Sequence, residues 1–430
     1  MMNDNQHIPS GYKPSPLGII PEDWEVRRLG EICTFLRNNT LSRNQLNEIN
    51  GKVQNVHYGD ILVKYPSVLN ARAESIPYVN QEDYKDTLNE FIEDGDVIMA
   101  DTAEDETVGK ACEIINVDSK QILAGLHTML IRPQKGLFAS SFLGYHINSN
   151  SYRRQLNALI QGIKVCSLGK QVIANTFLLV PPLPEQQRIV SVLSLWDTAI
   201  AKQTALIEQL TLRKRGLMQQ LLTGKKRLKG FEGEWKRIKL GDIAERITRK
   251  NEENNQNVVT ISAQRGFVVQ TDFFNKSVAS EILDNYYLAH RDEFCYNKSY
   301  SNGYPMGAIK RLKTFDKAVV TTLYICFKLR EKPQTNIDFF EQYCESGLFN
   351  KELVKVANEG GRAHGLLNVT PDDFFNMHMS VPSFEEQAAI ASVLVNADKE
   401  IEIQKQKLEV LQEQKKGLMQ VLLTGKRRIL

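Results

Sequence analysis

Two stretches of the chain carry apolar residues at the alternating three- and four-residue spacing of a heptad repeat, within an otherwise polar background. This spacing predicts two long helices, one in residues 181–228 and one in residues 381–430. The seam of the first helix consists of Leu193, Trp196, Ile200, Gln203, Ile207, Leu210, Lys214, Leu217 and Leu221. The seam of the second consists of Leu394, Ala397, Ile401, Gln404, Leu408, Leu411, Lys415, Leu418 and Leu422.

The two predicted helices are copies of one another. Residues 185–228 return as residues 386–429 without a gap, and both copies end on Leu-Leu-Thr-Gly-Lys. Parallel, in-register pairing would place two seam lysines against each other, at a high electrostatic cost. Antiparallel pairing in which facing residue numbers sum to 618 instead sets Gln203 against Lys415 and Gln404 against Lys214. We therefore predict an intramolecular antiparallel coiled coil, although an unpaired core face would have the same periodicity.

The segments before each helix combine strand-like and helical patterns. Strands are predicted where residues alternate with period two or are β-branched, at residues 127–132, 258–262 and 323–329. Helices are predicted at residues 140–159 and 337–357. Each segment opens with a Trp six residues before a Gly and closes on Val-Pro. Such a mixture is typical of mixed α/β domains.

These patterns predict an α+β fold with a pseudo-two-fold arrangement, in which two mixed α/β domains are joined by the long helices. The first domain would occupy residues 1–180 and be followed by the central helix at 181–228. The second would occupy residues 229–380 and be followed by the C-terminal helix at 381–430. The long helices and the motifs that open and close each domain are duplicated, whereas the rest of the two domains shares little sequence. This contrast suits a protein that performs one task on two different targets.

Composition narrows the class of protein. The chain of 430 residues is 42% hydrophobic and 24% charged, as in ordinary globular proteins. Its six cysteines are scattered without a CxxC motif, which argues against zinc and suits a reducing cytoplasm. No apolar run approaches the roughly 20 residues of a membrane span, and the N-terminus lacks a signal-peptide core. We therefore expect a cytoplasmic protein that does not contact a membrane.

The chain carries no recognisable catalytic signature. A methyltransferase would need an Asn/Asp-Pro-Pro-aromatic loop and a glycine-rich cofactor loop, and neither is present. Of a nuclease motif, only the Glu-x-Lys part occurs, at residues 234–236, and there is no Walker loop. His127 lies in a predicted strand and is expected to be structural. The sequence thus predicts no catalytic residue, no metal and no cofactor in this chain.

A stiff helical spacer between two similar domains suits DNA. The seam from Trp196 to Leu221 would span about 38 Å at 1.5 Å per residue. This is close to the roughly 34 Å between equivalent groove faces one helical turn apart. The net charge is only +3, with the excess of positive charge in residues 181–228, so DNA contacts must come from local clusters.

Candidate DNA-contacting residues are polar or basic side chains on predicted loops, since these types read base edges and bind phosphates. For each, an ordinary solvated loop is the alternative. In the first domain the candidates are Asn38, Arg43, Asn44, Thr102, Lys110 and Lys164. In the second they are Lys298, Ser299, Tyr300, Arg362 and His364.

The motifs resemble those of the specificity subunits of type I restriction–modification enzymes. The resemblance covers nearly the whole chain and rests on blocks that occur in the expected order. They are Pro-Pro-Leu-Pro-Glu-Gln-Gln at 181–187, the repeated Leu-Leu-Thr-Gly-Lys, the opening Trp…Leu-Gly, Asp-Gly-Asp-Val at 94–97 and Glu-Gly-Gly-Arg at 359–362. The second copy departs from the first at its helix entry, where Ser-Phe-Glu stands for Pro-Leu-Pro.

The resemblance implies a non-catalytic subunit for DNA-sequence recognition, with two target-recognition domains that each read one half of an asymmetric, bipartite double-stranded DNA site. The helices would set the spacer and dock modification (methyltransferase) subunits, two of them, with restriction subunits added for cleavage. The partner subunits would use S-adenosylmethionine, ATP and Mg²⁺. Two alternatives remain, namely a protein-interaction scaffold that does not read DNA, and a methyltransferase fused to its own recognition domains.

Overall fold

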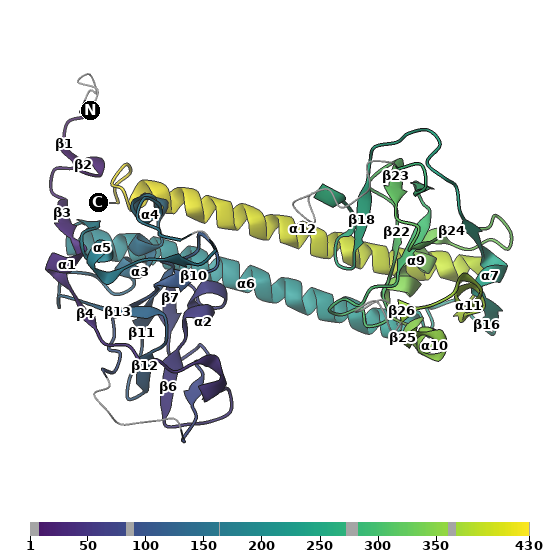
Figure 1. Cartoon of the computed structure of the whole chain (residues 1–430), viewed down its shortest axis with the longest axis horizontal. Coiled ribbons are helices and arrows are strands. Elements are labelled where there is room, and N and C mark those ends of the chain that lie inside the picture. The colour runs from purple at the N-terminus through teal and green to yellow at the C-terminus, as the bar shows by residue number, and fades with distance from the viewer. Residues whose placement is uncertain (1–7, 83–89, 163, 272–282, 360–366, 430) are drawn as a thin grey trace. The chain divides into compact units, whose positions relative to one another are not determined.

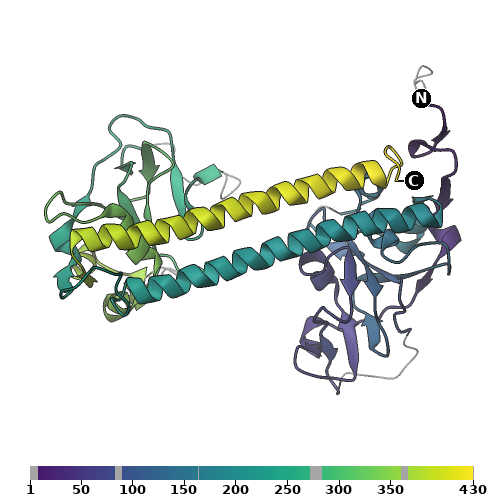
Figure 2. The ribbon, with the colours of Figure 1, turned by 180° about the vertical axis from the view of Figure 1, so that it is seen from behind.

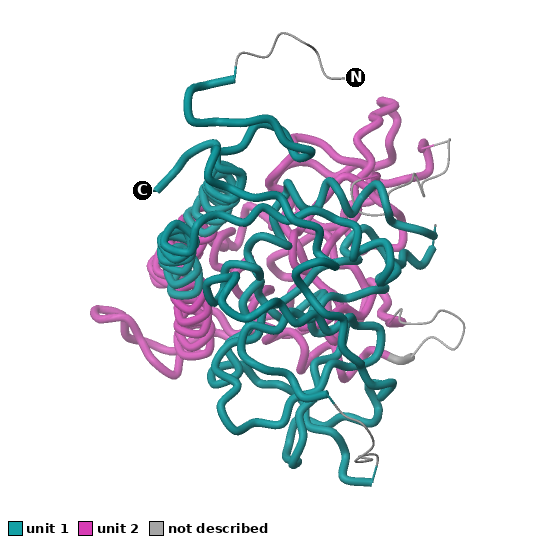
Figure 3. Tube along the Cα trace, turned by 90° about the vertical axis from the view of Figure 1, so that its left-hand side faces the viewer, with its two compact units in different colours: residues 1–203, 407–430 teal, residues 204–406 magenta. Residues whose placement is uncertain are grey.

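The computed structural model describes residues 8–82, 90–162, 164–271, 283–359 and 367–429. The chain packs into two units, residues 1–203 with 407–430 and residues 204–406 (Figure 3). The division falls inside two 39-residue helices, α6 (Leu183–Leu221) and α12 (Phe384–Leu422). Each unit therefore consists of one globular part together with part of each long helix. This division differs from the four segments proposed from the sequence because each helix packs on both globular parts in turn.

Both long helices end at the repeated Leu-Leu-Thr-Gly-Lys motif. Gly224 follows the end of α6 with φ +69°, and Gly425 follows the end of α12 with φ +70°. A left-handed residue just past a helix end closes off its last carbonyls, and glycine adopts that conformation without steric cost. The motif is thus a helix stop, and the helices end before the predicted limits of 228 and 430.

Unit 1 contains a five-stranded sheet in the order β4-β13-β9-β11-β7 and a four-stranded sheet in the order β12-β6-β8-β5 (Figure 1). Its strands are β1 (Tyr12–Ser15), β2 (Gly18–Pro21), β3 (Glu25–Arg28), β4 (Cys33–Leu36), β5 (Leu46–Asn47), β6 (Val53–Val56), β7 (Val68–Asn70), β8 (Tyr78–Val79), β9 (Val97–Ala100), β10 (Thr102–Ala103), β11 (Ala111–Ile115), β12 (Gln121–Ala124), β13 (Thr128–Pro133), β14 (Cys166–Ser167) and β15 (Phe177–Val180). Its shorter helices are α1 (Leu29–Ile32), η1 (Arg43–Gln45), α2 (Tyr58–Val63), α3 (Phe142–Ile147), α4 (Asn150–Asn157) and α5 (Lys170–Ala174).

The five-stranded sheet of unit 1 is buried on both faces. Val97 of β9 belongs to one apolar cluster and its neighbour Ile98 to another, as expected for side chains that alternate across a strand. Helix α3 lies between this sheet and α6: Leu143 packs with the sheet, whereas Phe142 packs with Leu193 of α6. The sheet, α3 and the long helix thus form successive layers.

Unit 2 contains a four-stranded sheet in the order β17-β24-β21-β22, with several two-stranded pairs around it. Its strands are β16 (Lys236–Lys239), β17 (Ala244–Ile247), β18 (Val259–Ser262), β19 (Gly266–Val269), β20 (Tyr287–His290), β21 (Phe294–Asn297), β22 (Ala308–Arg311), β23 (Lys317–Val320), β24 (Ile325–Leu329), β25 (Asn358–Glu359), β26 (Leu367–Asn368) and β27 (His378–Val381). Its shorter helices within the described residues are α7 (Leu240–Ile243), α9 (Ile337–Glu345), α10 (Asn350–Val356) and α11 (Pro371–Phe375).

The sheet of unit 2 repeats the layers of unit 1. Phe294 and Phe327 pack with Phe340 of α9 and with Leu394 of α12. The order β4-β13-β9-β11 in unit 1 recurs as β17-β24-β21-β22 in unit 2, with antiparallel pairing throughout. The predicted fold of two mixed α/β domains with long helices is confirmed.

The elements predicted inside the domains are found with small changes. The three predicted strands appear as β13, β18 and β24. Each of the two predicted helical stretches is broken into two shorter helices, α3 with α4 and α9 with α10. Ser149 caps α4 through its side-chain oxygen, which accepts a hydrogen bond from Tyr152 N. A cap of this kind starts a new helix rather than continuing an old one.

Within each unit, the parts of α6 and α12 that belong to it lie side by side and run in opposite directions (Figures 1 and 2). In unit 1 the Lys415 ammonium contacts the Asp197 carboxylate. In unit 2 Lys214 Nζ lies 2.6 Å from Asp398 Oδ1. The residue numbers of both pairs sum to 612. The predicted register of 618, which set Gln203 against Lys415, is therefore wrong. A carboxylate neutralises the ammonium, and an amide does not.

The aspartate of this ion pair also ties the long helices to the globular part. In unit 1 the Tyr145 hydroxyl on α3 donates to Asp197 Oδ2 at 2.6 Å, and Lys415 Nζ lies 5.2 Å from the centre of the Tyr145 ring. In unit 2 Gln342 Nε2 on α9 donates to Asp398 Oδ2 at 2.7 Å. The same network therefore occurs in both units, with a different donor from the globular part.

A second ion pair joins the start of each long helix to the segment that follows the other long helix. Glu386, with 1% of its surface exposed, accepts two hydrogen bonds of 2.6 Å from the Arg227 guanidinium. Glu185, 2% exposed, likewise accepts from Arg428, and also from Trp24 Nε1 at 2.9 Å. The glutamate of the Glu-Gln sequence at the start of each long helix thus holds that helix to the segment after the other one.

All of the predicted seam positions are buried or half-buried, which places them on the inner side of the long helices. They are Trp196, Ile200, Gln203, Ile207, Leu210, Lys214, Leu217, Ile401, Gln404, Leu408, Leu411, Lys415 and Leu418. Among the described residues, no helix is both long and apolar enough to cross a membrane.

Candidate nucleic-acid interface

In unit 1, polar side chains gather where β9 ends and β13 begins. These strands are antiparallel, with Ala100 paired to Thr128. The residues just outside the pair are therefore neighbours, and Asp101 N donates to His127 O at 3.1 Å. We call this place the edge of unit 1.

The side chains at this edge form a small polar network. Thr102 Oγ1 donates to Asp101 Oδ1 at 2.8 Å, and His127 Nδ1 lies 3.4 Å from Thr102 Oγ1. The His127 ring stands edge-on to Tyr58, with ring centres 5.3 Å apart. With 46% of its side chain exposed, His127 can present a ring nitrogen to a ligand. Hydroxyl, imidazole and phenol groups of this kind are suited to base edges and phosphates.

His127 differs from its prediction. It lies in the turn before β13 and has a φ of +53°, so it is not part of the strand. With this backbone conformation, the His127 side chain does not follow the alternation of strand side chains on which the prediction was based. His127 and Tyr58 therefore belong to the edge of unit 1, where the sequence pattern did not place them.

Two further candidates of unit 1 lie on loops near this edge. Asn38, half-buried, donates through Nδ2 to the carbonyl oxygen of Gly125, two residues before His127, at 3.2 Å. Lys164 is exposed in the loop before β14, whose Ser167 pairs with Thr102. The structure thus brings Asn38, Thr102 and the Lys164 loop to one region of unit 1.

The other candidates of unit 1 are held by contacts within the protein. Arg43 Nη1 lies 2.6 Å from Asp60 Oδ2, and the Arg43 guanidinium also faces Glu48 at 3.6 Å. Lys110 Nζ donates to a backbone carbonyl, that of Leu62, at 2.9 Å, and burial lowers the pKa of this lysine. These two cations stabilise the fold in this structure.

Asn44 has a local role of the same kind. It lies in η1, where its side-chain oxygen accepts a hydrogen bond from the Ser42 hydroxyl. The amide remains exposed to solvent.

In unit 2, a polar recess occupies the position that corresponds to the edge of unit 1. It lies where β21 ends and β24 begins, next to the pairing of Tyr296 with Ile325. The recess has a volume of about 330 Å³. Its polar lining includes the hydroxyl, amide and ammonium groups of Thr260, Ser262, Gln264, Asn297, Lys298 and Ser299. We call this place the edge of unit 2.

Lys298 is the cation of this recess. Burial, together with the nearby charge of Arg246, lowers the pKa of Lys298. Asn297 is fixed beside it, since its Nδ2 donates to the carbonyl of Ile261 at 3.2 Å and its Oδ1 accepts from Ser299 N at 3.0 Å. A partly desolvated ammonium gains from an acceptor atom, such as a phosphate oxygen or the O6 and N7 of guanine.

The remaining candidates of unit 2 are less informative. Tyr300 has 65% of its surface exposed and lies on the same loop as Lys298. Arg362 and His364 lie outside the described residues. The recess thus includes the predicted loop of Lys298, together with Thr260 and Ser262, which the sequence did not single out and which reach it from β18.

Comparison with known proteins finds similarity to DNA specificity proteins. Residues 21–212 match the family described as the type I restriction modification DNA specificity domain. Two relatives from Methanocaldococcus jannaschii align along nearly the full length. The putative type I restriction enzyme MjaX specificity subunit is 25% identical and is covered to 97%, as is this chain. The type I restriction enzyme MjaVIII specificity subunit is 24% identical, with 95% of this chain and 94% of the relative covered.

Solved structures show the same fold. The S subunit of a type I restriction–modification system from M. genitalium superposes with a TM-score of 0.50 at 14% identity, over 93% of this chain and 96% of that one. A chain from a study of complex assembly and conformational transition in the type I R-M system gives a TM-score of 0.56 at 16% identity, over 95% and 99%. The solved structures thus show the fold, and the chain is similar along nearly its whole length to type I restriction–modification specificity subunits, with the family match in residues 21–212.

Proposed function

We propose that this chain recognises an asymmetric, bipartite double-stranded DNA sequence, and that each unit reads one half of it. The chain would act as the recognition subunit of a type I restriction–modification complex and carry out no catalysis itself. Unit 1 would use its edge with Thr102 and His127, and unit 2 would use its edge with Lys298.

One observation carries this proposal, namely that the polar groups lie at corresponding places on a duplicated sheet. The β9–β13 pair of unit 1 corresponds to the β21–β24 pair of unit 2. By this correspondence Asp101 and Thr102 stand where Lys298 and Ser299 stand in unit 2. At these corresponding places unit 1 carries a carboxylate and unit 2 carries an ammonium. The two units should therefore favour different bases, because each base pair offers its own donors and acceptors.

The long helices support the second part of the proposal, which concerns spacing and assembly. Each is continuous over 39 residues, and its ion pairs recur in both units. We propose that the helices set the spacer between the half-sites and bind two modification subunits, to which restriction subunits are added. The S-adenosylmethionine, ATP and Mg²⁺ of the reactions would be bound by those partners, and the complex would work in the cytoplasm.

Binding measurements on the assembled complex test the proposal. The full-length chain is assembled with its modification subunits, and fluorescence anisotropy gives the affinity for duplexes with a single base pair changed in either half. Lys298→Ala should cost about 1–3 kcal/mol in binding and reduce discrimination in one half only. Thr102→Ala should reduce discrimination in the other half.

A matched control uses an exposed lysine of unit 2 that lies away from the recess. Lys229→Ala removes the same charge and should leave base discrimination unchanged. If Lys298→Ala and Lys229→Ala weaken binding equally for all sequences, the edge of unit 2 contacts phosphate only. If neither edge variant alters DNA binding while assembly with the partners is lost, the chain is a protein-interaction scaffold.

A further inference from the structure

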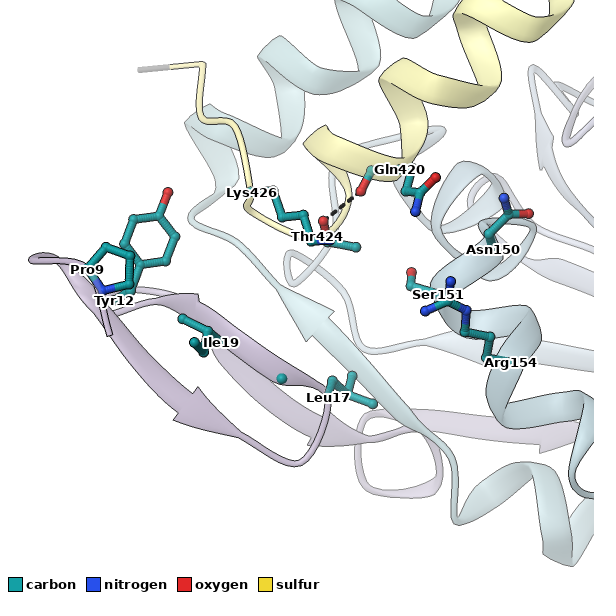
Figure 4. Close-up of a pocket in the computed structure, with 11 residues that line it drawn as sticks. Pro9, Tyr12, Leu17, Ile19, Asn150, Ser151, Arg154, Gln420, Thr424 and Lys426 are labelled. Carbon is teal, nitrogen blue, oxygen red and sulfur yellow. Dashed lines mark hydrogen bonds between the residues drawn. The ribbon is translucent and has the colours of Figure 1, made fainter. Parts of the chain in front are cut away.

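Unit 1 contains a cavity that lies apart from its candidate DNA-binding edge. Its volume is about 750 Å³. Figure 4 shows its three walls, which are the hairpin of β1 and β2, the start of α4, and the end of α12 with the turn that follows. No residue of the loop after β9 or of the turn before β13 lines it.

The hairpin wall is fixed in place by contacts with the C-terminal end of the chain. The Tyr12 hydroxyl donates to the carbonyl oxygen of Gly425 at 3.0 Å. Leu17 and Ile20 of the hairpin pack in the same apolar cluster as Leu422 and Leu423. The walls of the cavity are therefore held together by specific contacts within unit 1.

The lining combines an apolar side with a cationic side. Tyr12, Leu17 and Ile19 come from the hairpin, while Arg154 on α4 and Lys426 after α12 supply positive charge (Figure 4). No carboxylate lines the cavity, and within the described residues neither cation has an acidic partner within 4 Å. An occupant with apolar and acidic groups would complement both sides.

The hairpin wall of this cavity has no counterpart at the corresponding place in unit 2. The hairpin precedes Trp24 in unit 1, whereas Trp235 of unit 2 is preceded by the turn that leaves α6. Between residues 222 and 235, all of which are described, there is no strand. The long helices thus occur as two copies, but the described residues before Trp235 do not form the hairpin that walls the cavity in unit 1.

We propose that this cavity binds an acidic segment, bearing an aromatic or aliphatic side chain, of one modification subunit. This rests on the proposed function and deepens it, because two identical partners on a duplicated frame would then bind with unequal affinity. The partner on unit 1 gains the additional contact. Duplex DNA fits less well, since its phosphates complement the cations but leave the apolar hairpin side without a partner.

Native mass spectrometry of the assembled complex tests the proposal. The full-length chain is mixed with its purified modification subunit over a range of concentrations, and the populations with one and two modification subunits are measured. Arg154→Glu with Lys426→Glu should weaken the tighter of the two binding steps about tenfold or more, because two attractions become repulsions. Arg154→Lys with Lys426→Arg keeps the charges and should retain both steps.

A control variant separates this effect from overall charge. Lys52→Glu with Lys170→Glu makes the same charge change at exposed positions of unit 1 that do not line the cavity, and should leave assembly unchanged. Circular dichroism establishes that each variant is folded. If the charge reversal prevents folding, Arg154→Gln with Lys426→Gln is used, and a smaller loss in the same step is expected.

Two results would overturn the proposal. The first is unchanged binding of both modification subunits by the cavity variants. The second is unchanged assembly together with weaker binding of duplex DNA, which would make the cavity a phosphate site. Neither result bears on base discrimination by the two edges, so the proposed function would stand or fall separately.

Discussion

The ion pair between Asp197 and Lys415 allows the helix register to be tested by a double-mutant cycle. Asp197→Asn keeps the shape of the side chain and an acceptor for the Tyr145 hydroxyl, while it removes the negative charge. Lys415→Met keeps the length of the side chain and removes the positive charge. The coupling energy from the two single variants and the double variant then reports the interaction between the two charges.

The expected coupling follows from the surroundings of the pair. Exposed ion pairs contribute about 0.2–1 kcal/mol. The Lys415 side chain is only 15% exposed, that of Asp197 is 40% exposed, and the Tyr145 hydroxyl orients the carboxylate at 2.6 Å. We therefore expect a coupling at the upper end, about 1 kcal/mol. The same cycle on Lys214 and Asp398 should give a similar value.

Urea unfolding followed by tryptophan fluorescence measures the cycle, because Trp196 lies next to Asp197 on α6. The coupling should decrease in 1 M salt, where the Debye length falls to about 3 Å. A cycle on Gln203 and Lys415 serves as the comparison and should be additive within about 0.5 kcal/mol. Strong coupling of Gln203 with Lys415, and none of Asp197 with Lys415, would refute the register described here.

Four further variants test packing and contacts within the fold. Arg227→Met leaves the buried carboxylate of Glu386 without its cation and should destabilise the fold, read as a lower urea midpoint. Burial lowers the pKa of His146 from 6.5 to about 4, so the unfolded chain binds more protons and stability falls as the pH drops through this range. His146→Gln should therefore remove up to about 3 kcal/mol of pH dependence between pH 6.5 and 4, measured as the difference from the wild type. Gly144→Ala would place Cβ 2.3 Å from a carbonyl oxygen and should lower the melting temperature, at a cost of about 1–3 kcal/mol, whereas Gly216→Ala meets no atom within 4 Å and should stabilise α6 by about 0.5–1 kcal/mol.

The sequence predicted the frame well because its patterns are local or repeated. Heptad spacing gave the long helices, and the exact shift between copies gave the two-domain arrangement. The register was missed for a physical reason. The prediction paired seam residues only with one another, whereas Lys214 and Lys415 bind aspartates at positions beside the seam.

The candidate DNA-binding residues were harder to predict because they depend on which strands become neighbours. Thr102 and Lys298 could be proposed from loop composition alone. His127 and Thr260 could not, since they reach the two edges only through the pairing of β13 with β9 and the packing of β18 near β21. Arg43 had the right composition, but its guanidinium is engaged by two carboxylates.

The proposed function requires that the two edges read different bases. Its most direct test is sequencing of DNA methylation in cells that express this chain with its modification subunits. The wild type should give one bipartite motif. Thr102→Ala with His127→Ala should relax the bases of one half, and Ser262→Ala with Lys298→Ala those of the other, with the spacer unchanged in both. If either pair of substitutions alters both halves, or if neither alters the motif, the two edges do not read the DNA.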